Sequence, residues 1–168
     1  MECRPASAED ADRVAELLEQ LDHPATSEAA RRRLQVLAAS HNDDGWVAER
    51  DGTVVGLVAI HVSASLERDG EVAKVNAIVV DEAARRQGVG KQLMALAERE
   101  ARRRGCVLLF LTTAERRQDA HAFYRGLGFE ETGRRFAKPT ARPSLRAKSW
   151  TPSRSGSATS ARESDSTS

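Results

Sequence analysis

A glycine-rich turn between an apolar run and a predicted helix carries the strongest chemical signal in the chain. The turn reads "ARRQGVGKQL" and follows "VNAIVV". Gly88 and Gly90 have no side chains, so an anion can approach the backbone N–H groups that open the helix, where the helix dipole favours negative charge. Arg85, Arg86 and Lys91 add positive charge beside them. The pattern therefore predicts a turn that binds a phosphate group.

The turn matches neither of the two common nucleotide-binding motifs. A Walker loop needs a glycine five residues before the Gly-Lys pair and a Ser or Thr after it, but Arg85 and Gln92 occupy those positions. A dinucleotide-binding turn needs a third glycine, where this chain has Leu93. The remaining pattern, Arg-x-x-Gly-x-Gly, suits a pyrophosphate bound without magnesium. The alternative is a tight turn that has no ligand.

A second motif lies downstream on a short predicted helix. The stretch "DAHAFYRGLGF" places Phe123 and Tyr124 on a helix that closes at Gly128. Together with the turn and the order of predicted elements, it resembles the Gcn5-related N-acetyltransferase (GNAT) superfamily over residues 2–138. The stretch "RRQDAHAFYRGLGFEETGRRFAK", and His61 in "GLVAIHV", are similar to the branch that contains aminoalkylphosphonate and related small-amine N-acetyltransferases.

The resemblance implies acetyl-coenzyme A as the cosubstrate and assigns residues to it. In the family the strand before the turn separates from its neighbour, which frees backbone groups of Ile78, Val79 and Val80 to pair with the pantetheine arm. The turn would then hold the pyrophosphate with Arg85, Arg86, Gln87, Gly88, Val89, Gly90 and Lys91. Tyr124 matches the acid that protonates the departing thiolate, and an ordinary tyrosine pKa of about 10 keeps it a donor at neutral pH. The alternative is that Tyr124 only packs.

The base expected from the family is missing. Members that use a strand glutamate place it at the position held here by Lys74, which cannot accept a proton while it is charged. Histidine titrates near neutral pH, so His61 on a neighbouring strand is a candidate base, an orienting group or an ordinary strand residue. A water chain, or an acceptor that arrives as the free amine, is a further alternative. Lys74 and Asn76, taken as in phase on one strand, are candidate ligands for an anionic group of the substrate.

The implied reaction is direct attack of a primary amine on the thioester in a ternary complex, with a small molecule as the acceptor. Two other functions stay open. One is a protein N-terminal or lysine acetyltransferase, which needs an open groove between the second helix and the last strands. The other is a non-catalytic sensor that binds acyl-coenzyme A. Tyr124 argues against the sensor, whereas the missing glutamate argues for it.

The elements that must position these residues predict an α/β (α+β) chain, and the resemblance implies the GNAT fold. Its mixed central sheet is expected to have six to seven strands, to be splayed at the fourth strand, and to carry about four helices. Asp51-Gly52 between two β-rich runs predicts a tight hairpin. Val14, Leu17, Leu18 and Leu21 predict an amphipathic helix. The predicted ranges are helices near 8–21, 27–39, 88–104 and 119–127, strands 2–5, 45–50, 53–62, 72–80 and 106–112, and one or two last strands in "FEETGRRF".

Composition limits what else the chain can be. Hydrophobic residues make up 40% and charged residues 30% of the 168 residues, and the net charge is +1. This predicts one soluble globular domain with no field that recruits nucleic acid or a membrane, and the resemblance implies that this domain, residues 1–139, is the acetyltransferase. Residues 140–168, rich in Ser, Thr and Arg, are expected to be a disordered tail. The two cysteines lack CxxC spacing and His121 has no second ligand at helical spacing, so no metal is expected. We expect a cytoplasmic monomer or homodimer.

Overall fold

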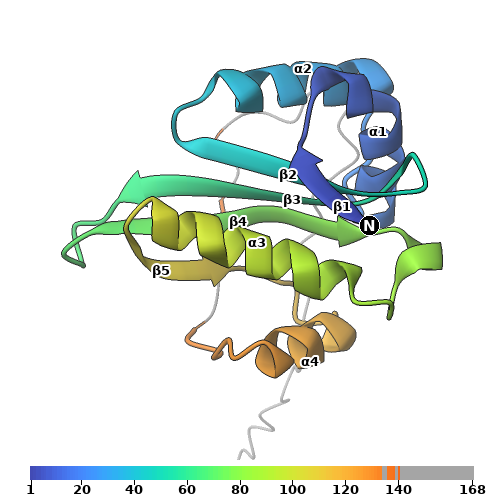
Figure 1. Cartoon of the computed structure of the whole chain (residues 1–168). Helices are drawn as coiled ribbons and strands as arrows, with labels where there is room; N and C mark the ends of the chain where they lie inside the picture. The colour runs from blue at the N-terminus through green and yellow to red at the C-terminus, as the bar shows by residue number, and fades with distance from the viewer. Residues whose placement is uncertain (134–135, 139, 141–168) are drawn as a thin grey trace, which may run out of the picture. The chain divides into compact units, whose positions relative to one another are not determined.

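Five strands form one mixed sheet that has helices on both faces (Figure 1). The computed structural model describes residues 1–133, 136–138 and 140, and residues 1–133 form one compact unit. The elements follow one another as β1 (Glu2–Pro5), the 3₁₀ turn η1 (Ala8–Asp10), α1 (Ala11–Gln20), α2 (Ser27–Ala39), β2 (Asp43–Arg50), β3 (Thr53–Ala64), β4 (Glu71–Val80), the 3₁₀ turn η2 (Glu82–Ala84), α3 (Val89–Arg103), β5 (Cys106–Leu111) and α4 (Gln118–Gly126).

The strands lie in the order β1-β2-β3-β4-β5, so every strand neighbours the one that follows it in the chain. The first four are antiparallel, and β5 runs parallel to β4 after the crossover through α3. The expected hairpin at Asp51-Gly52 is confirmed. Both residues have positive φ, 50° and 75°, which is the backbone conformation that a two-residue turn between twisted strands requires.

The prediction of six to seven strands is wrong for the described residues, which contain five strands and the expected four helices. The stretch Phe129–Gly133 forms no strand. Two adjacent glutamates and a glycine have low strand propensity and offer only one apolar side chain to a sheet. Residues 134–135 and 141–168 lie outside the described residues, and with them almost all of the predicted tail.

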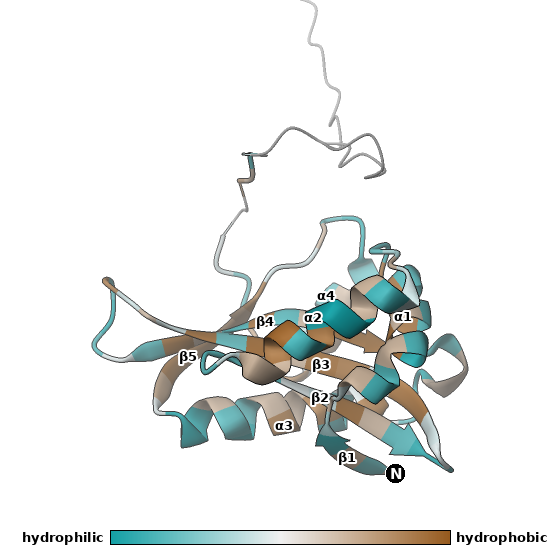
Figure 2. Ribbon diagram, turned by 90° about the horizontal axis from the view of Figure 1, so that it is seen from above, coloured by the Kyte–Doolittle hydropathy of each residue, from teal (hydrophilic) through white to brown (hydrophobic). Residues whose placement is uncertain are grey.

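Two apolar cores lie on opposite faces of the sheet. One face packs against α1 and α2, with Val14, Leu17 and Leu34 among its buried residues. The other face packs against α3, with Leu93 and Met94 buried; the side chains of α4 join this second core. Coloured by hydropathy, the central strands are the most apolar part of the molecule (Figure 2). Burial on both faces explains why their sequences run apolar almost without interruption.

An extra residue in β4 changes which side chains face each core. Opposite β3, Ala77 pairs with Ala59 and Val75 pairs with Ile60, so Asn76 has no partner. Such a β-bulge breaks the alternation of the strand. Val75 before the bulge and Ile78 after it therefore both face α3. Asn76 is the extra residue at this bulge, and its alignment in phase with Lys74 stays a prediction.

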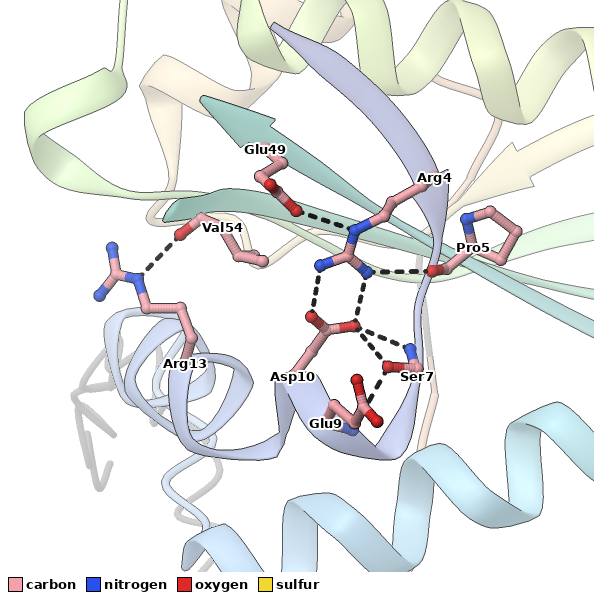
Figure 3. Close-up of polar contacts among 8 residues, drawn as sticks. All are labelled: Arg4, Pro5, Ser7, Glu9, Asp10, Arg13, Glu49 and Val54. Carbon is pink, nitrogen blue, oxygen red and sulfur yellow. Dashed lines mark hydrogen bonds and ion pairs between the residues drawn. The ribbon is translucent and has the colours of Figure 1, made fainter. Parts of the chain in front are cut away.

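An ion-pair cluster fixes the entry to α1 against the edge of the sheet (Figure 3). The Arg4 guanidinium on β1 donates to both carboxylate oxygens of Asp10, at 2.8 and 3.0 Å, and to Glu49 on β2, at 2.8 Å. Asp10 also accepts from the backbone N–H of Ser7, whose side chain caps η1 by accepting from the Glu9 N–H. Burial raises the pKa of the Asp10 carboxyl, but the bonds from Arg4 and Ser7 outweigh it and hold that pKa below its usual range.

Candidate functional site

The sheet opens between β4 and β5. Parallel pairing between the two strands runs from Glu71 with Cys106 to Val75 with Leu111 and ends there. Beyond the bulge at Asn76, residues 77–80 of β4 pair with β3 alone. Because β5 stops while β4 continues, the outer edge of β4 carries backbone groups that no strand among the described residues satisfies.

The register identifies which backbone groups face this opening. The N–H of Asp81 donates to the carbonyl of Val55 on β3 at 2.9 Å. Backbone groups of successive residues point to opposite sides of a strand, so those of Val80 and Ile78 point away from β3 and toward the opening. Those of Val79 point into the β3 ladder, and its side chain is buried under α1. Of the three predicted strand residues, Ile78 and Val80 have backbone groups that face the opening, and the Val80 carbonyl there already accepts from Arg85 Nε.

The glycine-rich turn presents free N–H groups at the start of α3. Gly88 has φ 84° and ends the turn, and its carbonyl receives the first helical bond, from Gln92. Within the described part of the chain, the N–H groups of Val89, Gly90 and Lys91 have no acceptor. A side chain at Gly88 would meet open space. The site of the predicted anion is therefore accessible and lined by unpaired donors.

Cationic side chains surround the turn. Arg85, Arg86 and Lys91 are all exposed, and Arg85 folds back so that its Nε donates to the carbonyl of Val80 at 3.2 Å. Gln87 donates to the carbonyl of Ala83 and accepts from Arg50 at the end of β2, at 2.5 Å. Sequence reasoning missed Arg50, because its place beside the turn follows from the pairing of β2 and not from any local motif.

Asp81 anchors the turn to α1. Its carboxylate caps η2 by accepting from the Ala83 N–H at 2.9 Å, and it also accepts from Arg13 and from Gln20 at 3.1 Å. Gln20 in turn accepts from the N–H of Glu82 at 3.0 Å. The bonds from Arg13 and Gln20 hold the pKa of Asp81 below its usual range. The start of the turn is thus fixed by two side chains of a helix more than sixty residues earlier in the chain.

Tyr124 lies on α4, half-buried among aromatic rings. Its ring centroid is 5.3 Å from that of Phe123 and 6.0 Å from that of Phe129. Burial raises the pKa of the Tyr124 hydroxyl above its ordinary value, and Arg117 opposes this weakly. The tyrosine is therefore protonated throughout the neutral range, as a proton donor must be. The helix ends where expected, with Gly128 at φ 87° after the last turn.

Phe123 joins α4 to the glycine-rich turn. A Cβ built on Gly90 would lie 3.2 Å from its ring atom Cζ. Gly90 thus allows close packing of α4 as well as the approach of a ligand, a role that the local motif does not reveal. Near the end of β5, the buried Thr113 hydroxyl has no partner among the described residues. An orphaned polar atom beside the opening fits a site that takes a polar ligand.

His61 and Lys74 face each other across β3 and β4. Their neighbours Ile60 and Val75 face α3, so both side chains lie on the opposite face of the sheet, the one that carries α1 and α2. His61 Nδ1 is 2.9 Å from Asp43 Oδ1 on β2. Asn76, the bulge residue, is exposed. The structure therefore brings His61 and Lys74 together and adds Asp43, whereas Tyr124 packs into the core on the other face.

A groove lies between α2 and the start of β2, next to Asp43. It has a volume of about 440 Å³ and is lined by Ala29, Arg32, Arg33, Val36, Leu37 and Asp43. None of the predicted cofactor residues lines it. In the described part of the chain no cluster of side chains could hold a metal ion, and no helix there is long and apolar enough to cross a bilayer.

Comparisons with known proteins agree with this geometry. The model of the family described as "Acetyltransferase (GNAT) family" matches residues 12–129. A transcriptional regulator from Bacillus halodurans C-125 is 25% identical with a TM-score of 0.76, covering 82% of this chain and 98% of that one. No curated protein sequence matches the chain.

Two aminoglycoside acetyltransferases share the fold. A 6′-N-acetyltransferase from Acinetobacter haemolyticus is 23% identical with a TM-score of 0.72, over 85% of this chain and 100% of that one. An N-acetyltransferase solved in complex with coenzyme A is 22% identical with a TM-score of 0.73, over 83% and 95%. At these identities the likeness is one of fold alone.

Proposed function

Because this chain belongs to the acetyltransferase (GNAT) family, we propose that it moves an acetyl group from acetyl-coenzyme A to the primary amine of a small molecule. Acetyl-coenzyme A is the cosubstrate of the family, and coenzyme A is bound in a solved relative. The observation that carries the proposal is the pair of features at the opening. The backbone groups of Ile78 and the N–H of Val80, which no strand among the described residues satisfies, lie just before the free N–H groups of the turn.

Each part of the cosubstrate has a matching set of groups. The amides of the pantetheine arm would pair with Ile78 and Val80 in place of the missing strand. The pyrophosphate would accept from the N–H groups of Val89, Gly90 and Lys91, with charge compensation from Arg85, Arg86 and Lys91. Val79 contributes packing only, since its backbone groups belong to β3.

Tyr124 is proposed as the acid. Attack of a neutral amine on the thioester carbonyl breaks the C–S bond and leaves a thiolate. The phenol proton of Tyr124 passes to that sulfur and gives free coenzyme A, and the tyrosinate is then reprotonated by the proton that the nitrogen loses. Burial raises the pKa of Tyr124 above that of an exposed tyrosine, so the transfer of its proton is driven by the negative charge that develops on the sulfur as the C–S bond breaks.

Cationic groups favour an acceptor that carries an anionic group. The family resemblance puts Lys74 at the position of the strand glutamate that some members use, and Arg32 and Arg33 line the groove beside Asp43. A small amine with a carboxylate, phosphate or phosphonate would place its anion near these cations. Affinity for such an acceptor would then fall as salt rises. An aminoalkylphosphonate, the acceptor suggested by the resemblance to that branch, is one such amine and remains a prediction.

The test is release of free thiol from acetyl-coenzyme A with a panel of amines: neutral, cationic and acidic small amines, aminoglycosides, and peptides with a free N-terminus or lysine. Turnover of a small amine supports the proposal. Turnover of peptides alone points to a protein acetyltransferase, and tight cosubstrate binding without any turnover points to a sensor. In the Lys74→Ala variant, KM should rise at least several-fold for acidic amines and stay unchanged for neutral ones; an unchanged KM for every acidic amine contradicts the role of Lys74.

A further inference from the structure

A histidine and a carboxylate form a hydrogen-bonded pair on the sheet face that bears α2. His61 on β3 and Asp43 on β2 are direct cross-strand partners, and their Nδ1 and Oδ1 atoms are 2.9 Å apart. The second oxygen of Asp43 accepts from the Ser40 hydroxyl at 2.6 Å. With both oxygens engaged, the carboxylate holds the imidazole ring in one orientation and leaves its Nε2 atom outside the pair.

The pair is fixed by backbone as well as side-chain bonds. Ser40, the residue after α2, accepts from the Asn42 N–H at 3.2 Å, and the Asn42 carbonyl accepts from the Val62 N–H at 2.7 Å. These bonds tie the α2–β2 connection to the strand that carries His61. The side chain of His61 is 40% exposed and that of Asp43 is 29% exposed, so the pair is open to a substrate from this face.

The pair also lies near the sheet opening. His61 on β3 is the cross-strand partner of Lys74 on β4. Lys74 directly precedes Val75, the last residue of β4 that pairs with β5. The thioester of a donor held by Ile78 and Val80 would lie close beyond that point. Asp43 at the same time lines the groove under α2. His61 therefore stands between the proposed entry of the acceptor and the proposed position of the donor.

We infer that His61, oriented by Asp43, is the base that deprotonates the acceptor amine. This rests on the proposed function. The acceptor arrives as an ammonium ion, and Nε2 of His61 takes one proton to give the free amine and an imidazolium. The nitrogen lone pair then forms the C–N bond, the C–S bond breaks, and the nitrogen loses a second proton. One of the two protons ends on the thiol and the other in solvent.

In the described part of the chain, three cations and one anion lie around His61. Lys74 on β4 faces the ring, and Arg32 and Arg33 on α2 line the groove at Asp43. All three oppose a positive charge on the imidazole. Asp43 is the opposing anion; burial raises its pKa, but the bonds from Ser40 and His61 and the more distant charge of Arg104 hold that pKa below the usual range. Asp43 is therefore ionised at neutral pH and can stabilise the imidazolium.

The experiment compares His61→Gln, Asp43→Asn and Asp44→Asn. Asp44 is the matched control, because it is a neighbouring half-buried carboxylate that pairs with Arg104 at 2.7 Å and not with His61. For each variant kcat/KM is measured against pH with amines of graded basicity, and the thermal midpoint is recorded. Cosubstrate binding is measured separately by titration with coenzyme A.

At pH 7 we expect kcat/KM to fall about 100-fold or more in His61→Gln and about 10-fold or more in Asp43→Asn. Coenzyme A affinity should stay within about twofold in both. The deficit should shrink as the pH approaches the pKa of the amine, and it should be smaller for weakly basic amines, because a free amine needs no base. Nitrogen chemical shifts should show His61 as the Nδ1–H tautomer in the wild type and a mixture of tautomers in Asp43→Asn. Asp44→Asn should keep the wild-type pH profile.

Three outcomes overturn the inference and differ from one another. A wild-type enzyme that acetylates amines while His61→Gln matches its pH profile leaves the proposed function standing and removes His61 from it. No turnover of any amine by the wild type overturns the proposed function and the inference with it. A constant deficit at every pH and with every amine would show that the pair is structural only, which also contradicts the inference.

Discussion

Replacing Gly90 by alanine tests how closely α4 is coupled to the glycine-rich turn. The new Cβ would lie 3.2 Å from Cζ of Phe123, 3.6 Å from its Cε2 and 3.6 Å from Cγ2 of Val80. The first distance is several tenths of an ångström shorter than ordinary carbon contact. Phe123 has little freedom to withdraw, because its ring packs on Tyr124. The substitution must therefore displace the start of α3 or the helix that carries the proposed acid.

The magnitude follows from two opposing effects. Overpacking a well-filled site costs about 1–3 kcal/mol, whereas alanine in place of glycine in a helix contributes up to about 1 kcal/mol. We expect Gly90→Ala to lower the free energy of unfolding by about 0.5–2 kcal/mol. Gly126→Ala is the matched control, because Gly126 is also helical and its Cβ would meet nothing within 4 Å. That variant should be stabilised by about 0.5–1 kcal/mol.

Urea denaturation gives the stabilities, and steady-state kinetics give the consequences for function. Gly90→Ala should raise KM for acetyl-coenzyme A and lower kcat, since both the turn and Tyr124 are displaced. Adding Phe123→Leu should restore stability, because the shorter side chain leaves room for the Cβ, but it should not restore KM if the pyrophosphate also approaches Gly90. A Gly90→Ala variant with wild-type stability and wild-type KM would refute both roles assigned to this glycine.

Three further predictions concern the acid, the anchor of the turn and the response to low pH. Tyr124→Phe should lower kcat about 100-fold or more with an unchanged affinity for coenzyme A, because the ring packing is kept; a kcat within threefold of wild type would remove the acid role. Asp81→Asn should raise KM for acetyl-coenzyme A several-fold and lower the free energy of unfolding by about 1–3 kcal/mol, while the exposed control Glu28→Gln changes stability by about 0.5 kcal/mol or less; equal effects on stability and KM in the two variants would contradict the anchor. Asp10, Asp43 and Asp81 have pKa values below the ordinary value of 3.8, so their contribution to stability is present above about pH 4 and is lost as pH falls through the lowered values; urea midpoints that stay constant from pH 5 to pH 2 would contradict it.

Local patterns predicted most of the elements. The helix expected at 88–104 is found at Val89–Arg103, and the short helix expected at 119–127 is found at Gln118–Gly126. In both cases a glycine with positive φ follows the helix end and marks it. The hairpin could also be predicted from the sequence, because the dipeptide Asp51-Gly52 specifies a tight turn by itself. Such features depend on neighbours in the sequence, which is why a single sequence reveals them.

Features that depend on register could not be predicted in this way. Nothing local to Asn76 marks it as a bulge, because the extra residue is defined only by its pairing with β3. Asp43 gave no signal either, since it meets His61 across two strands and eighteen positions of sequence. Gly90 was interpreted through the ligand alone, although its Cβ position faces a ring thirty-three residues away. In each case the cause is a contact that only the folded sheet creates.

Asn76 makes β4 one residue longer than its partner strand at the bulge. This extra residue sets the alternation of side chains, which is called the frame of the strand. Without this one residue, the two halves of the strand would have to share one alternation. Either Lys74 would turn into the apolar layer beneath α3, or Ile78 and Val80 would leave that layer and turn toward α1. A change of side chain at Asn76 leaves this frame intact, whereas loss of a single codon does not. At the bulge, the residue type can therefore change, whereas an insertion or deletion cannot be accommodated. The number of residues in β4, and not the side chain at position 76, sets which residues face the site.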